Sequence, residues 1–138
     1  MDNDVRDWFR RRTYRTAQFD PFQLAATKLR SGDRISVVLP ALNEERTVGE
    51  IVERIRGCLI EDIPLVDELV VIDSGSQDGT ASAARAAGAT VISVDELLLA
   101  YGRRPGKGDA LWKSLYATTG NIVAFLDSDL IDFDPSFV

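Results

Sequence analysis

Residues 35–44 read Ile-Ser-Val-Val-Leu-Pro-Ala-Leu-Asn-Glu, and this stretch decides the fold. Its first five residues are mainly β-branched and apolar, which is typical of a strand buried on both faces. We expect the strand to stop at Pro40, because proline has no backbone N–H for a neighbouring strand. The polar residues Asn43, Glu44 and Glu45 then follow at the carboxyl end of the strand.

Strands and helices alternate along the rest of the chain. Thr47 and Glu50 have the spacing of a capping box, and apolar residues recur behind them at helical period. Gly88 suits a left-handed C-cap, and Gly120 is expected to close a later helix. The expected elements are helices over 47–59, 81–87 and 109–117, and strands over 69–72, 91–94 and, again buried, 122–126.

Residues 1–30 are expected to form a helical arm that packs on the main domain. The arm carries three apolar residues on one helical face, namely Val5, Trp8 and Phe9. Asp20 followed by Pro21 is typical of a helix N-terminus. A turn at 31–33 separates the arm from the domain over 31–138.

The alternation predicts an α/β fold of Rossmann-like type, with a mostly parallel sheet and helices on both faces. Ligands bind such sheets beyond the carboxyl ends of the strands. Three polar clusters stand at those ends, over 43–45, 73–76 and 127–129. The sequence therefore predicts a polar ligand site at one edge of the sheet.

The composition of the 138 residues excludes several classes of function. A net charge of −6 argues against general binding to nucleic acid, and we interpret the basic residues from Arg10 to Arg15 as a solvated helix face or an oligomer contact. No apolar stretch is long enough to span a membrane and no secretory signal is seen, so we expect a cytoplasmic protein. The single cysteine and the lack of histidine leave oxygen atoms to ligate any metal.

The segment Asp127-Ser128-Asp129 is a candidate metal site. If the chain stays extended after its strand, the two carboxylates project from one side, with their Cα atoms about 7 Å apart. Mg²⁺ prefers such oxygen ligands and completes its shell with phosphates and water. An exposed acidic turn is the alternative for an Asp-x-Asp segment taken alone.

Two further segments are candidates for ligand contact. In the loop over 73–80 we assign Asp73 and Ser74 to the ligand, and Asp78 and Thr80 mainly to structure, with Asp78 or Thr80 capping the next helix. A well-capped turn without a ligand is the alternative there.

In the second segment, Lys107 lies between two glycines before a helix, where it can neutralise a diphosphate, although the motif is not a Walker loop. A solvent-exposed lysine is the alternative. Three apolar residues of that helix, Leu111, Trp112 and Leu115, are expected in the core rather than in a sugar site.

These segments occur in the order found in glycosyltransferases of the GT-A fold, which the chain resembles. The resemblance is carried by residues 40–45, 73–76, 106–108 and 127–129. The amino-acid sequences of three segments are similar to those of the glucosyl-3-phosphoglycerate synthases specifically, namely residues 106–112, residues 127–132 and the arm around 19–22.

That resemblance implies a retaining transfer of glucose from UDP-glucose to 3-phosphoglycerate, a step towards methylglucose polysaccharides. It implies that Asp129 ligates Mg²⁺ or Mn²⁺, and that Asp127 and Ser128 contact the ribose side of the nucleotide, with Lys107 nearby. The uridine pocket would be lined by Pro40, Ala41, Leu42, Glu44 and Ser74.

Members of that family continue well past the Asp-x-Asp segment, into a part that carries the acceptor site and a metal-binding histidine. We therefore assign no catalytic residue, and expect the isolated chain to bind nucleotide and transfer nothing. By the same resemblance we expect a homodimer. The alternatives are a mannosyl transferase, a transferase to polyprenyl phosphate, or a non-catalytic nucleotide-binding fragment.

Overall fold

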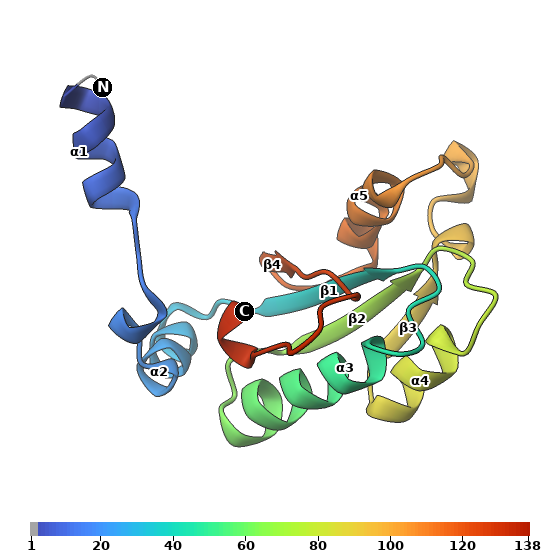
Figure 1. Ribbon diagram of the computed structural model, residues 1–138, viewed down its shortest axis with the longest axis horizontal. Helices are drawn as coiled ribbons and strands as arrows, with labels where there is room; N and C mark the ends of the chain where they lie inside the picture. Colours follow the sequence, from blue (N-terminus) through green and yellow to red (C-terminus); the bar gives the residue numbers. More distant parts are fainter. Residues whose placement is uncertain (1–2) are drawn as a thin grey trace.

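The computed structural model describes residues 3–138, and its centre is a sheet of four parallel strands (Figure 1). The strands lie in the order β3-β2-β1-β4. Their bounds are Ile35–Ala41 for β1, Glu68–Asp73 for β2, Thr90–Ser93 for β3 and Ile122–Phe125 for β4. Each connection between successive strands contains at least one helix, and this confirms the predicted α/β architecture.

The central strand β1 runs through Pro40 instead of stopping there, which corrects the prediction. Pro40 is paired in register with Ile72 of β2. Ala41 turns its carbonyl to β2, where it accepts a hydrogen bond from Ser74 N at 2.9 Å. Pro40, one residue earlier, therefore turns its missing N–H towards β4, and the pairing of β1 with β4 has already ended at Val38.

One face of the sheet is covered by α3 (Val48–Arg56) and α4 (Thr80–Ala87). The helical period predicted for α3 is confirmed, because its apolar positions are buried. The predicted capping box is wrong: the Thr47 side chain makes no cap bond, and its hydroxyl donates to the backbone carbonyl of Ser128 at 2.6 Å. Gly88 has the left-handed backbone (φ 103°) expected at the end of α4.

The other face of the sheet is covered by α5 (Lys107–Ala117). The prediction that its apolar residues enter the core is wrong, since Leu115 is 54% exposed and Leu111 and Trp112 are only partly buried. The helix instead buries four small or polar residues, Asp109, Ala110, Lys113 and Ser114. Helical period alone could not reveal this, because the buried polar groups of α5 satisfy one another.

Strand β4 is half exposed, contrary to the prediction of a fourth buried strand. Ile122 and Phe125 are 45% and 43% exposed, because β4 forms the edge of the described sheet and pairs only with β1 there. Gly120 does not end α5, whose C-cap is Thr118. The glycine is instead required by space, because a Cβ atom on it would lie 2.5 Å from Ser36 Oγ.

The N-terminal arm consists of α1 (Asn3–Arg12), a short 3₁₀ turn over Thr16–Gln18, and α2 (Pro21–Ser31). Asp20 caps α2 as predicted, by accepting a hydrogen bond from Phe22 N. Lys28 fixes α2 to the domain through Asp67, at 2.7 Å. By contrast, α1 buries no residue and projects from the domain (Figure 1), so the prediction that the whole arm packs on the domain is wrong for α1.

Across residues 3–138, no helix is both long enough and apolar enough to cross a membrane.

Candidate functional site

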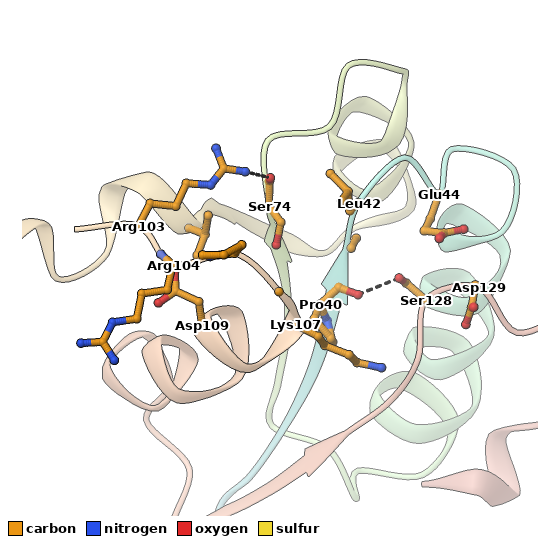
Figure 2. A pocket seen from close by; sticks show the side chains of 14 residues that line it. Pro40, Leu42, Glu44, Ser74, Arg103, Arg104, Lys107, Asp109, Ser128 and Asp129 are labelled. Carbon is orange, nitrogen blue, oxygen red and sulfur yellow. Dashed lines mark hydrogen bonds between the residues drawn. The ribbon is translucent and has the colours of Figure 1, made fainter. Parts of the chain in front are cut away.

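A cavity of about 270 Å³ opens at the carboxyl ends of β1 and β2 and at the N-terminus of α5 (Figure 2). It stands where open parallel sheets bind ligands. Most of the residues predicted for the site line this cavity: Pro40, Ala41, Leu42, Glu44, Ser74, Lys107, Ser128 and Asp129. Asp73 and Asp127 were predicted with them but are not among the lining residues.

The loop after β1 is fixed to the loop after β2 by hydrogen bonds. Glu44 N donates to Thr80 Oγ1 at 2.7 Å, and Asn43 N donates to Ser76 Oγ at 2.9 Å. In return, Asn43 Oδ1 accepts from Gln77 N at 2.8 Å. Asn43 has a left-handed backbone (φ 58°), which asparagine tolerates better than most residues. Leu42 and Glu44 are thereby held as one wall of the cavity.

Asp78 and Thr80 serve the structure of the loop, as predicted, but the N-cap of α4 is Gly79, which makes no side-chain cap bond. The Thr80 hydroxyl donates to Asp78, and this bond lowers the pKa of the Asp78 carboxyl below its usual value. Asp78 also accepts hydrogen bonds from the backbone N–H groups of Thr80 and Glu45. Asp73 serves the same loop, because its Oδ1 accepts from Ser76 N at 3.2 Å. Of the two residues assigned to the ligand in this loop, only Ser74 faces the cavity.

The Asp-x-Asp segment is a turn and not an extended strand end, because β4 stops at Phe125 and residues 128–129 lie in the turn. Ser128 is buried and its hydroxyl donates to Pro40 O at 2.7 Å (Figure 2). This bond places Asp129, whose exposed side chain lines the cavity. Asp127 forms an ion pair with Lys107. The two carboxylates therefore have different surroundings, contrary to the predicted shared side.

The N-terminus of α5 forms another part of the wall. Gly106, which has φ 105°, precedes the helix, and both it and Lys107 line the cavity. Backbone N–H groups in a first helical turn lack helical partners and favour an anion. Lys107 is half exposed and already paired with Asp127. It is therefore a charged group at the cavity rather than a lysine free in solvent.

Sequence reasoning missed the residues that close the cavity from the side of β3. These are Val94, Arg103, Arg104, Pro105 and Asp109. Arg103 donates to the backbone carbonyl of Ser74 (Figure 2). It also donates to Asp95, at 3.3 Å. The segment before α5 has no helical or strand period, so only the paired arginines beside Pro105 could have drawn attention to it.

The residues present fit one part of a magnesium or manganese site. No group of three acidic, histidine or cysteine side chains is close enough in residues 3–138 to hold a metal alone. Asp129, however, offers an exposed carboxylate on the cavity that Lys107 and the N-terminus of α5 also line. Mg²⁺ is commonly bound by one or two carboxylates together with phosphate oxygens and water.

The chain is similar in sequence to two mycobacterial glucosyl-3-phosphoglycerate synthases. The protein from Mycolicibacterium smegmatis is 58% identical over 109 residues, which are 79% of this chain and 35% of the relative. The protein from Mycolicibacterium paratuberculosis is 48% identical over 95% of this chain and 38% of its own length. The chain thus spans less than half the length of these relatives.

Solved structures agree with the fold. The crystal structure of mannosyl-3-phosphoglycerate synthase from Rubrobacter xylanophilus matches 94% of this chain at a TM-score of 0.90 and 45% identity, over 41% of that protein. Glucosyl-3-phosphoglycerate synthase from Mycobacterium tuberculosis, in complex with Mn²⁺, UDP-glucose and phosphoglyceric acid, matches 86% at a TM-score of 0.79 and 50% identity, over 40% of its length.

A family model supplies the remaining comparison. The model of glycosyl transferase family 2 matches residues 36–136, a span that includes all four strands except Ile35 of β1, and every residue named above as lining the cavity. The chain therefore belongs to glycosyl transferase family 2.

Proposed function

We propose that residues 31–138 bind the donor UDP-glucose together with a divalent cation, and that residues 1–30 form a separate arm. The observation that carries this proposal is the cavity at the ends of β1 and β2, which gathers an apolar wall, a lysine at a helix N-terminus and one exposed carboxylate. The match to a relative solved with Mn²⁺ and UDP-glucose supports it.

Each wall has a chemical task in this proposal. Pro40, Ala41 and Leu42 provide apolar contact for the base, with Ser74 beside them. Lys107 and the first N–H groups of α5 take the diphosphate, because both favour negative charge. Asp129 holds Mg²⁺ or Mn²⁺ against the phosphates; the cation supplies Lewis-acid stabilisation of the leaving diphosphate. The ribose side is assigned to Ser128, which lines the cavity, and to Asp127, whose carboxylate would have to turn from Lys107 to reach the nucleotide.

Uridine selectivity tests the donor assignment. The cavity reads a base through Leu42, Glu44 and Ser74, and not through a glycine-rich phosphate loop that would accept any nucleotide. Calorimetry on this chain with Mn²⁺ should therefore give a lower Kd for UDP than for ADP or GDP. Equal Kd values would mean that the base is not recognised, and would withdraw the assignment of these loops.

For the whole protein we propose retaining transfer of glucose from UDP-glucose to 3-phosphoglycerate. The 58% identity to the M. smegmatis synthase favours glucose. The likeness to a mannosyl-3-phosphoglycerate synthase makes mannose the second candidate. A chimera tests both, in which residues 1–138 replace the matching segment of the M. paratuberculosis relative. Product from UDP-glucose supports the proposal, and product from a mannose donor alone contradicts it.

We also propose that the protein is a homodimer. The exposed apolar residues of α1, Trp8 at 60% and Phe9 at 52%, support an intermolecular contact, since they are too exposed to stabilise the domain. Light scattering during size-exclusion chromatography measures the mass directly. A monomeric mass for both the chain and the chimera would contradict this part of the proposal.

A further inference from the structure

A buried ion pair lies on the face of α5 that packs against the sheet. Lys113 Nζ lies 3.1 Å from Asp109 Oδ2, and the two side chains are only 1% and 2% exposed. Two charges are seldom buried without a strong reason, because removing them from water costs more than their attraction usually returns. Their neighbours indicate what they do.

Three of the four other hydrogen bonds of this pair go to one segment, residues 94–104. Lys113 Nζ donates to the backbone carbonyl of Gly102 at 2.8 Å and to that of Val94 at 3.4 Å. Asp109 Oδ2 accepts from Arg104 N at 3.2 Å, while its Oδ1 accepts from Trp112 Nε1 at 3.0 Å. The pair therefore binds the backbone of this segment at three points.

The middle part of the segment 94–104 contacts α5 through an edge-to-face packing of the Tyr101 ring on the Trp112 ring, and otherwise has little buried surface. Its large apolar side chains Leu99 and Tyr101 are 76% and 65% exposed. Its backbone is left-handed at Leu98, with φ of 50°, and φ is also positive at Gly102, at 66°. Such a conformation is unfavourable for leucine and persists only where surrounding contacts fix it. Polar contacts to α5 are thus a main restraint on this segment.

The same segment carries Arg103 and Arg104, which form the cavity wall opposite Leu42. Figure 2 shows Arg103 reaching over to Ser74 and Asp109 beneath the wall. Burial alone raises the pKa of the Asp109 carboxyl, but the hydrogen bonds that it accepts, led by the one from Arg104 N, hold that pKa below its usual value. Asp109 therefore stays charged as an acceptor.

We propose that the buried Asp109–Lys113 pair is a positioning device, which fixes residues 94–104 and so sets the affinity of the cavity for the nucleotide. This inference rests on the proposed function for its ligand, but the restraint on the segment is measurable without one. Asp109 and Lys113 act through Arg103 and Arg104, and are positioning residues in this scheme.

The test replaces the pair by apolar residues of similar length, in the double variant Asp109→Leu/Lys113→Met. Apolar replacement of a buried ion pair is often neutral or stabilising, so the thermal midpoint should stay at or above that of the wild-type chain. Hydrogen exchange at residues 97–104 should nevertheless become faster by about tenfold or more, and the Kd for UDP with Mn²⁺ should rise by about tenfold, as expected for lost hydrogen bonds. A purely structural role would not separate stability from affinity in this way.

Two further variants complete the test. Asp7→Leu/Arg10→Met removes an exposed ion pair on α1, and should change neither the hydrogen exchange at residues 97–104 nor the Kd for UDP. Lys113→Arg keeps the charge and the donors, and should keep the Kd within about threefold of wild type. Unchanged exchange at 97–104 in the Asp109→Leu/Lys113→Met variant overturns the inference whatever the ligand. If the wild-type chain does not bind UDP, the proposed function fails, while the exchange result still decides the positioning role.

Discussion

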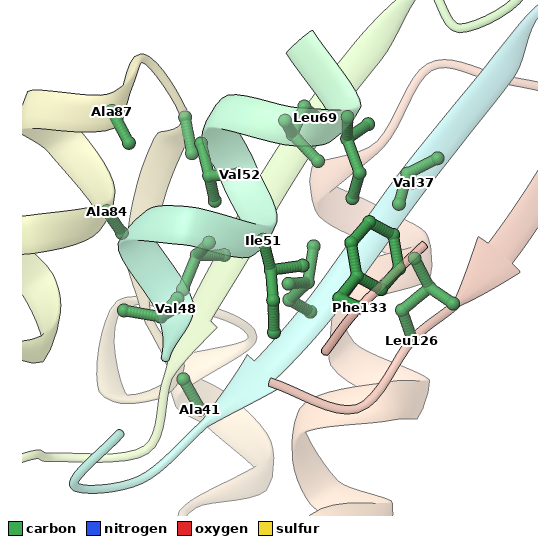
Figure 3. Close-up of a cluster of buried hydrophobic side chains, with 14 of the residues drawn as sticks. Val37, Ala41, Val48, Ile51, Val52, Leu69, Ala84, Ala87, Leu126 and Phe133 are labelled. Atoms are coloured by element: carbon green, nitrogen blue, oxygen red, sulfur yellow. The ribbon is translucent and has the colours of Figure 1, made fainter. Parts of the chain in front are cut away.

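The two faces of the sheet are built from different chemistry. The face under α3 and α4 holds a cluster of sixteen buried apolar residues, centred on Ile51 and Phe133 (Figure 3). The face under α5 holds five, beside the buried groups of Asp109, Lys113 and Ser114. Because buried apolar area is the main source of folding free energy, the first face stabilises the domain. The second is less apolar, and the cavity opens on its side.

A substitution that creates a cavity in the apolar cluster under α3 and α4 should have the largest effect on stability. Ile51 is 1% exposed, so Ile51→Ala should lower the free energy of unfolding by about 2–5 kcal/mol. Urea titration measures this change. Ile131→Ala is the matched control, because Ile131 is 82% exposed and its loss should cost less than about 0.5 kcal/mol. Equal effects of the two variants would contradict the division between the faces.

Removing the charge of Asp129, on the side of the cavity, should leave the fold intact and strongly reduce the rate of glucose transfer. In the chimera, Asp129→Asn should lower Mn²⁺-stimulated transfer by about 10²-fold or more, the scale for losing a group that stabilises charge in the transition state. Circular dichroism should show an unchanged fold. Rates are compared by Mn²⁺ titration.

Two matched variants make that result specific. Asp132→Asn is a like substitution three residues on, at an exposed left-handed position (φ 56°) that asparagine tolerates, and should keep the rate. Asp127→Asn should weaken nucleotide binding more than it alters the response to Mn²⁺. A normal metal response in folded Asp129→Asn would remove Asp129 from the proposed metal site.

Loss of the lysine should have an intermediate effect. Lys107→Ala should weaken binding of UDP by about 1–3 kcal/mol, the scale for a hydrogen bond to a charged group, and leave the unfolding midpoint unchanged. Calorimetry gives the Kd. Arg85→Ala, an exposed cation on α4 at the opposite face, is the control. An unchanged Kd for Lys107→Ala would contradict the proposed contact of Lys107 with the diphosphate, and would leave only its ion pair with Asp127.

The smallest expected effect concerns the attachment of the arm, which belongs to neither face. Burial alone raises the pKa of Asp67, but hydrogen bonds from Lys28 and Ile35 N outweigh it and leave that pKa lowered. A carboxyl with a lowered pKa stabilises the fold above its unfolded pKa of about 3.9, and this stabilisation is lost as the pH falls through the folded value.

Asp67→Asn should therefore cost about 1 kcal/mol at pH 7 and progressively less below pH 4. Urea unfolding of wild type and variant at pH 7 and at pH 3 checks the sign. Asp62→Asn, at an exposed position, should cost less than about 0.5 kcal/mol at pH 7. A difference between Asp67→Asn and wild type that grows in acid would refute the assignment.

The face under α3 and α4 was more predictable from sequence than the face under α5. Apolar period identifies Val48, Ile51 and Ile55 because burial of those positions follows from hydrophobicity alone. The same rule gave the wrong face for α5, since Lys113 is buried through an ion pair with Asp109 on the same helix and through the Val94 and Gly102 carbonyls, which hydrophobicity does not reveal. Arg103 was missed for a similar reason: its partners, the Ser74 carbonyl and Asp95, are brought to it by the fold.

The order of the polar segments placed the site at the carboxyl ends of the strands, and the resemblance to a known family supplied most of its residues. Of the residues that the resemblance implied for the uridine, all five line the cavity: Pro40, Ala41, Leu42, Glu44 and Ser74. Asp73 and Asp127 were predicted from their places after β2 and β4 but turn to Ser76 and Lys107. Which of two adjacent polar side chains faces a cavity depends on turn geometry, and spacing does not encode it.

Pro40 gives the sheet edge its shape. Pairing of β1 with β2 continues to Ala41, whereas pairing of β1 with β4 ends at Val38, three residues earlier. Because Pro40 lacks an N–H on the side of β4, β4 pairs with a shorter part of β1 than β2 does. The three unpaired residues of β1 leave a notch about 10 Å deep at the carboxyl end of the sheet. The Pro40 carbonyl inside this notch is free to receive the Ser128 hydroxyl. A residue with an N–H at position 40 would allow the hydrogen-bonded pairing of β1 with β4 to continue beyond Val38. The longer β4 would then fill the notch next to which Asp129 lies.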